Sequence, residues 1–278
     1  MRFGLSIPNF APFDDLRQVT ELAREAEANG WDGFFLWDHI HLTQRPMLDP
    51  WVALASIAVA TERIRIGTMV TPVARRRPWK LARETVTLDH LSGGRLILGV
   101  GLGHPPEPEF AAFGEETDDG VRARRLDEGL DVLAGLWSGE PFSYQGEEFT
   151  VEGALFLPKP VQQPRIPVWV AGVWPHRTPM RRAARWDGAF PMQNDPATGQ
   201  LVWLAPRDVE EILAFVREQR DPDAPFDLAI GRPLRVDDPQ RARDLVAELE
   251  AAGATWWMES AAGPDDLRER IRQRPLGA

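Results

Sequence analysis

The sequence contains no cysteine and only two lysines, Lys80 and Lys159, among its 278 residues. The absence of cysteine excludes disulfide bonds, thiolate metal sites and a cysteine nucleophile. Neither lysine lies at the end of an expected central strand, so a Schiff-base mechanism of the aldolase kind is not expected. A Gly-x-Ser-x-Gly motif is also absent, which argues against a serine nucleophile on a strand-to-helix turn.

Long hydrophobic runs are missing too. The longest, residues 51–60, has about half of the roughly 20 residues that a membrane-spanning helix requires. Pro8 and Pro12 interrupt the first apolar stretch and Asp14 follows, so we expect no secretory signal and a cytoplasmic protein. The formal charge of −10, from 42 acidic and 32 basic residues, disfavours nucleic acid and membranes as partners.

What the sequence does contain is a regular alternation of short apolar runs with longer amphipathic stretches. The apolar runs are continuous, as expected of strands buried on both faces. Eight such pairs in a chain of 278 residues fit a (β/α)₈ TIM barrel, which typically has roughly 250 residues. We therefore predict a single barrel domain over residues 1–278. An open doubly wound sheet is the alternative, but no compositional break separates two halves.

The expected strands cover residues 3–7, 33–37, 64–69, 95–100, 166–170, 188–191, 226–230 and 255–258. The expected helices cover residues 14–29, 50–60, 79–91, 124–137, 180–186, 208–219, 241–252 and 265–273. Two insertions interrupt this order, at residues 104–122 after strand four and at 139–167 before strand five, and the second includes an expected hairpin around Gln145-Gly146. Such insertions are often functional, although a simple surface cover explains them equally well.

A run of alternating glycines, Gly99, Gly101 and Gly103, ends the fourth expected strand. A dinucleotide-binding fingerprint would need a third glycine where His104 stands, followed directly by a helix. The prolines at 105, 106 and 108 are not expected to begin one, so this fingerprint is excluded. At a barrel strand end the glycines would let a flat ligand approach the backbone, or they relieve crowding inside the barrel; both interpretations stay open.

Four of the five histidines fall in expected strand-to-helix loops, where barrel enzymes place their chemistry: His39, His41, His104 and His176. Histidine suits proton transfer near neutral pH. A metal site is the alternative, with Asp38, His39, His104 and Asp49 as conceivable ligands. Neighbouring residues of a strand point to opposite faces, and no His-Glu-x-x-His helix motif occurs, so we predict no catalytic metal.

Several segments in this order resemble the bacterial luciferase-like flavin monooxygenase superfamily. They are Trp37-Asp38-His39 after strand two and residues 66–72, 94–103, 109–114, 124–130, 157–160 and 183–188. The resemblance implies a (β/α)₈ barrel that binds FMN or the deazaflavin F420 at the carboxyl ends of its strands. It also implies a cis peptide bond, not preceding proline, within residues 68–70.

The resemblance implies the following site residues. The cofactor ring would contact strands two to four, through Trp37, Asp38, Thr68, Met69, Val70, Gly101 and Gly103. The cofactor phosphate would lie near Ala171, Gly172, Val173, Arg177 and Thr178. His39 is the implied proton donor or base, paired with Asp38. His104 stands where sugar-phosphate dehydrogenases of this superfamily carry an acid, which argues against a sugar phosphate as substrate.

A reduced flavin needs a dry site, for which Phe10, Trp37, Trp174 and Trp203 are the candidate aromatic lining. The sequence therefore predicts a flavin-type oxidoreductase acting on a small organic substrate. It would be an F420-dependent hydride transferase, or a monooxygenase that uses FMNH2 with oxygen and a flavin reductase. A flavin-binding protein without turnover is the alternative. Because relatives are often dimers, a homodimer is also expected.

Overall fold

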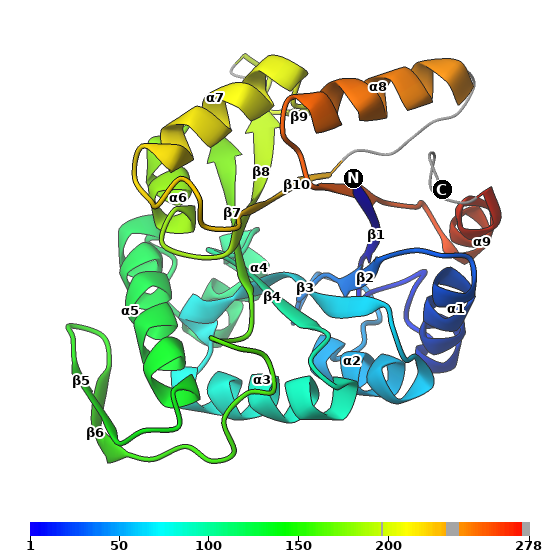
Figure 1. Ribbon diagram of the computed structural model, residues 1–278. Helices are drawn as coiled ribbons and strands as arrows, with labels where there is room; N and C mark the ends of the chain where they lie inside the picture. Colours follow the sequence, from blue (N-terminus) through cyan, green and yellow to red (C-terminus); the bar gives the residue numbers. More distant parts are fainter. Residues whose placement is uncertain (196, 232–238, 274–278) are drawn as a thin grey trace.

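A computed structural model describes residues 1–195, 197–231 and 239–273 of the chain. Within these residues eight parallel strands follow one another around a sheet in the order β10-β11-β1-β2-β3-β4-β7-β8, and pairing of β8 with β10 closes the barrel. Helices surround the strands on the outside (Figure 1). The predicted (β/α)₈ barrel is thus confirmed, and the open doubly wound sheet is wrong.

The barrel strands are β1 (Arg2–Ile7), β2 (Gly33–Leu36), β3 (Arg65–Pro72), β4 (Leu96–Gly101), β7 (Val168–Trp174), β8 (Gly188–Asn194), β10 (Asp227–Gly231) and β11 (Trp256–Glu259). The outer helices are α1 (Leu16–Ala28), α2 (Pro50–Ala60), α3 (Pro78–Ser92), α5 (Asp119–Trp137), α6 (Arg177–Ala183), α7 (Pro206–Arg217), α8 (Pro239–Ala251) and α9 (Pro264–Gln273). Each predicted strand and helix overlaps one of these elements. A short strand that was not predicted, β9 (Leu201–Val202), pairs antiparallel with β8.

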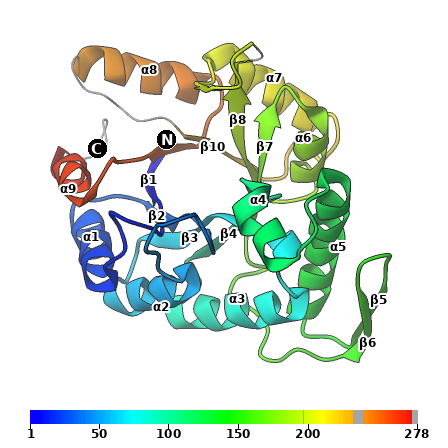
Figure 2. The same cartoon turned by 180° about the vertical axis from the view of Figure 1, so that it is seen from behind.

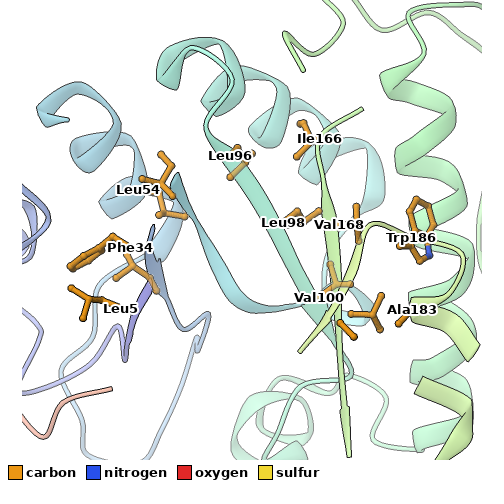
Figure 3. Packing of buried hydrophobic residues seen from close by; sticks show 14 of the residues in the cluster. Leu5, Phe34, Leu54, Leu96, Leu98, Val100, Ile166, Val168, Ala183 and Trp186 are labelled. Carbon is orange, nitrogen blue, oxygen red and sulfur yellow. The ribbon is translucent and has the colours of Figure 1, made fainter. Parts of the chain in front are cut away.

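The barrel interior is filled by large side chains that face glycines on neighbouring strands. Phe35, Trp169 and Trp256 pack with ring centroids 5.2 to 6.0 Å apart. A Cβ at Gly33 would lie 2.5 Å from Phe35, and one at Gly188 would lie 2.5 Å from Trp169. These glycines are therefore needed to accommodate the aromatic rings. A second apolar layer joins strands to helices, and Figure 3 shows Leu98, Val100 and Val168 within it.

The insertion after β4 contains the one-turn helix α4 (Pro106–Glu109) and the 3₁₀ turn η2 (Ala111–Phe113). The prolines thus begin a one-turn helix that was not expected from the sequence, while the exclusion of the dinucleotide fingerprint stands. Proline is tolerated in a first helical turn because the amides there lack intrahelical partners in any case. Figure 2 shows α4 beside the ends of β3 and β4. This insertion therefore brings Glu109 to the carboxyl ends of the strands.

The insertion before β7 forms the predicted hairpin, with strands β5 (Phe142–Gln145) and β6 (Thr150–Ala154). It extends outward beyond α3 and α5 (Figure 1). Glu128 of α5 holds its turn by accepting hydrogen bonds from the amides of Glu147, Glu148 and Phe149 at 2.8 to 3.0 Å. None of the helices in the described ranges is long and apolar enough to cross a membrane.

Candidate active site

Asp38 lies just after β2 and forms the centre of a buried cluster of charged groups. Its carboxylate accepts hydrogen bonds from Nη2 of Arg75 and of Arg76, both at 2.8 Å. Thr71 Oγ1 at 2.8 Å and Trp51 Nε1 at 3.2 Å also donate to it. Because the Asp38 side chain is only 1% exposed, its hydrogen-bonding capacity is taken up within the protein.

The charges of this cluster depend on one another. Burial alone would raise the pKa of Asp38, but the positive charges of Arg76 and Arg75 and the hydrogen bond from Thr71 outweigh burial and lower that pKa below its ordinary value. Burial lowers the pKa of Arg75, and the negative charge of Asp38 opposes that change. An ionised Asp38 therefore holds two arginines of the loop after β3 in place.

His39 pairs with a carboxylate that comes from α4. Its Nδ1 lies 2.8 Å from Oε1 of Glu109, and the two side chains are 18% and 1% exposed. Oε2 of Glu109 accepts a hydrogen bond from the Ile40 amide at 3.1 Å and lies 3.6 Å from Nη2 of Arg75. Arg75 thus connects the Glu109 carboxylate to that of Asp38, and His39 is the partly exposed end of the network.

The loop that carries His39 is fixed by backbone contacts and by aromatic rings. Asn9 donates to the His39 carbonyl at 2.8 Å and accepts from the His39 amide at 3.1 Å. The rings of Phe10 and Trp37 lie 5.6 and 5.9 Å from the His39 ring. Of the other two predicted lining residues, Trp174 is 1% exposed and Trp203 is 41% exposed. Phe10 and Trp37 are therefore the two that surround the histidine.

Residues of three adjacent strands meet where the cofactor ring is predicted. The peptide bond between Met69 and Val70 is cis, as the resemblance implied. A Cβ placed on Gly101 would lie 2.9 Å from Val70 and 3.7 Å from Ala171, so β3, β4 and β7 converge at this point. The Val70 side chain is half-buried, while Thr68 and Met69 are buried beneath it. Val70 is thus the most exposed of these three residues of β3, and its predicted contact with the cofactor ring stays a prediction.

Crowding between strands accounts for the alternating glycines. A Cβ at Gly99 would lie 2.2 Å from the Thr68 carbonyl oxygen. At Gly103, whose φ is +86°, a Cβ would lie 2.8 Å from Pro72 and 2.9 Å from Phe110. Any larger residue here would have to displace backbone or a buried ring. The crowding interpretation therefore holds for these glycines, and their predicted contact with a ligand stays a prediction.

The residues predicted to bind the phosphate lie at the end of β7 and the start of α6. Gly172 is packed tightly, since a Cβ there would lie 2.1 Å from Pro179. Val173 is half-buried, and Arg177 and Thr178 are exposed. The Arg177 guanidinium lies between two rings, 4.3 Å from the Trp174 centroid and 4.7 Å from that of Phe215. Among the described residues Arg177 forms no ion pair, and its predicted contact with a phosphate stays a prediction.

The remaining predicted polar residues stand apart from the His39 network. His104 is exposed and has no hydrogen bond or ion pair to any residue in the described ranges. His176 is also exposed, and His41 contacts the Phe113 ring at 5.8 Å. Asp49 caps α2, accepting from the Trp51 and Val52 amides. Among the described residues no three acids or histidines are grouped as a metal site would require.

Sequence reasoning missed Glu109 and Arg75 as members of the site. Glu109 begins the segment 109–114 that carries part of the family resemblance, so its position was marked although its role was not. Arg75 opens a run of three arginines directly after the third strand, opposite an acid at the end of the second. That pattern of charge at neighbouring strand ends is a signal that could have paired Arg75 with Asp38.

Residues 1–277 match the family described as luciferase-like monooxygenase. The chain belongs to this family. An uncharacterized relative from Mycobacterium tuberculosis is 34% identical over 191 residues, which are 61% of this chain and 64% of that protein, so less than two thirds of that relative is matched. An F420-dependent glucose-6-phosphate dehydrogenase from Nakamurella multipartita is 28% identical over 98% of this chain and 86% of its own length.

Solved structures of the luciferase-like fold match nearly the whole chain. The F420-dependent tetrahydromethanopterin reductase of Methanopyrus kandleri has a TM-score of 0.76 at 19% identity, covering 98% of this chain and 96% of its own. Monooxygenase RslO1 of Streptomyces bottropensis has a TM-score of 0.77 at 21% identity, covering 98% and 97%. At these identities the matches show the fold.

Proposed function

We propose that this luciferase-like protein is an oxidoreductase that uses a reduced flavin-type cofactor, F420 or FMN, to act on a small organic substrate. Family membership over residues 1–277 supports redox chemistry. The relative from Nakamurella multipartita, which is named F420-dependent, supports F420 as the first cofactor to test. When bound, such a cofactor supplies the hydride or electrons, and the protein contributes binding, orientation and proton transfer.

The observation that carries this proposal is the pair of His39 and Glu109 at the carboxyl ends of the strands. With Nδ1 of His39 donating to Oε1 of Glu109 at 2.8 Å, Nε2 holds a lone pair and can accept a proton from a substrate hydroxyl. The same nitrogen, once protonated, returns the proton in the reverse direction. Glu109 thus sets the tautomer of His39, and the rings of Phe10 and Trp37 pack 5.6 and 5.9 Å from the imidazole.

The chain residues proposed to hold the cofactor fall into two groups. Val70, Gly101 and Ala171 form the surface for the ring, on three strands that meet. Arg177 and Thr178 are proposed to bind the phosphate, because both are exposed at the start of α6. A guanidinium fork donates two parallel hydrogen bonds to a phosphate, and the aromatic stack orients that fork.

Cofactor binding and oxygen dependence test the proposal. We expect F420 or FMN to bind the purified chain saturably, measured by absorption and fluorescence titration. Turnover with each reduced cofactor, with and without oxygen, then separates the two activities, because a hydride transferase retains its activity without oxygen whereas a monooxygenase loses it. His39→Ala is expected to lower kcat/KM by about 10²-fold or more. Unchanged turnover in this variant, or binding without any turnover, contradicts the proposed role.

We also propose that the chain forms a homodimer through α2. This helix has no charged residue, and Val52 and Val59 on its outer side are 61% and 68% exposed. A helix that is apolar on all sides is normally covered. Light scattering of the unaltered protein should give twice the mass of one chain. The double variant Val52→Glu with Val59→Glu should give the mass of a single chain. A single-chain mass for the unaltered protein contradicts the dimer.

A further inference from the structure

A second site borders the charged cluster around Asp38 and shares Arg75 and Arg76 with it. It is a cavity of about 180 Å³ between the loop after β3, the start of α5 and the hairpin turn. Four arginines, Arg75, Arg76, Arg77 and Arg125, and two acids, Glu115 and Glu148, line it. None of the residues proposed above to contact the cofactor is among them, so the cavity needs a separate explanation.

The arginines present donors that the protein leaves without acceptors. Asp38 receives hydrogen bonds from Nη atoms of Arg75 and Arg76, but the buried Nε atoms of both have no acceptor among the described residues. Arg77 has no carboxylate within 4.0 Å in that part of the chain. Arg77 is also the N-cap residue of α3 and provides no side-chain cap, so the positive end of a 15-residue helix lies here.

The two acids do not cancel these donors. Glu148 is already held by Arg125 at 2.9 Å and Arg124 at 3.2 Å, and the hydrogen bond from Arg125 is the main cause that lowers its pKa. Glu115 lies 3.9 Å from Arg125 and is 43% exposed. An anion at the cavity can therefore pair with the exposed Arg77 without displacing an ion pair, and the unpaired Nε groups of Arg75 and Arg76 add positive charge behind it.

We propose that this cavity binds a phosphate group, either as inorganic phosphate or as the end of a phosphomonoester. Guanidinium groups match phosphate oxygens in geometry and charge. The volume of about 180 Å³ holds a phosphate with several waters or an ester arm, since one water needs only about 10–15 Å³. This inference does not depend on the cofactor proposed for the strand ends.

Calorimetric titration of the purified full-length chain tests the proposal, with inorganic phosphate in one series and glycerol 3-phosphate in another at constant ionic strength. Arg77→Ala is expected to weaken binding about tenfold or more, since it removes a charged donor. Arg125→Ala is expected to weaken binding as well, since it removes the cation that pairs with Glu148 at 2.9 Å and leaves the cavity more negative. Arg181→Ala is the matched control, because Arg181 is an exposed arginine on α6 away from the cavity.

Tighter binding of inorganic phosphate identifies the free ion as the ligand, and tighter binding of the ester identifies a phosphorylated metabolite. Circular dichroism of each variant separates loss of binding from loss of fold. If Arg125→Ala unfolds, Arg77→Ala still tests the proposal. Arg77 is exposed and belongs to no buried ion pair among the described residues, so its removal should leave the fold intact. Absence of saturable binding in both series, or Arg77→Ala binding as tightly as Arg181→Ala, overturns the proposal.

Discussion

The two sides of the barrel mouth differ in how far the protein already uses its own polar groups. On the side of β2 to β4, the side chains of Asp38, Glu109 and Arg75 are 1%, 1% and 5% exposed, and Arg75 pairs with both carboxylates. On the side of β7, Arg177 and Thr178 are exposed, and Arg177 contacts only the faces of two rings among the described residues. On the first side these three side chains are paired before any ligand arrives, whereas on the second side Arg177 has no ion-pair partner among the described residues.

This difference separates residues that position others from residues that bind. A buried carboxylate with charged partners holds a loop in one geometry, but it has no capacity left for a ligand. An exposed guanidinium held by aromatic contacts keeps its N–H groups available. Asp38 therefore acts through Arg75 and Arg76, while His39 and Arg177 are the groups proposed to meet the substrate and the cofactor. Substitution of Asp38 should therefore lower stability, whereas substitution of Arg177 should weaken cofactor binding.

The largest effect is expected from Asp38→Asn, measured as the free energy of unfolding in urea. The change leaves the buried Arg75 and the half-buried Arg76 without their shared anion, and breaking a buried pair costs about 3–5 kcal/mol. Asp14→Asn, at an exposed aspartate in the loop before α1, is the control and should leave stability unchanged. Equal stability of the two variants would show that the buried cluster is not held by charge.

The same carboxylate should determine part of the stability in acid. The pKa of Asp38 is lowered in the folded protein, so its contribution is fully present above the unfolded value of about 3.9 and is lost as the pH falls toward the lowered value. The difference in unfolding free energy between the unaltered chain and Asp38→Asn should therefore shrink below about pH 4. Urea titrations on both sides of that pH measure it, and a constant difference contradicts the assignment.

A smaller effect, on activity, is expected from Glu109→Gln. Glutamine keeps the shape but removes the charge that holds Nδ1–H of His39, so we expect kcat/KM to fall about 10²-fold. The ¹⁵N chemical shifts of the imidazole should report a changed tautomer. Glu107→Gln on the same turn of helix is the matched control, because Glu107 is exposed. If both variants retain full activity and the same shifts, Glu109 does not position His39.

The sequence alone was sufficient for the fold but not for these partnerships. The alternation of apolar and amphipathic runs is a local pattern, and each strand and helix predicted from it overlaps one in the structure. Asp38 meets Thr71 and Arg76 across 33 and 38 positions, and His39 meets Glu109 across 70 positions. Local pattern carries no information on which loops meet at that distance, and only a motif resemblance marked the segment that contains Glu109.

The glycines at the end of β4 are a second case in which the sequence alone does not reveal a long-range contact. Gly99 and Gly103 stand at a strand end where ligand contact and crowding predict the same residue type. The three-dimensional structure shows the crowding, because a Cβ at Gly99 would lie 2.2 Å from the Thr68 carbonyl oxygen. The glycine pattern in the sequence thus marked these positions, but the reason for glycine there is crowding by the neighbouring strand β3.

The smallest of the predicted effects concerns the β7 side, where Arg177→Ala should weaken cofactor binding about tenfold by removing a charged donor to the phosphate. Stability should change little, because an exposed cation–π contact is worth about 0.5–1 kcal/mol. Arg181→Ala, one turn further along α6 and also exposed, is the control and should bind as the unaltered chain does. Fluorescence titration measures both. Equal affinity of the two variants would place the phosphate elsewhere and would remove the contrast between an assembled side and a binding side of the mouth.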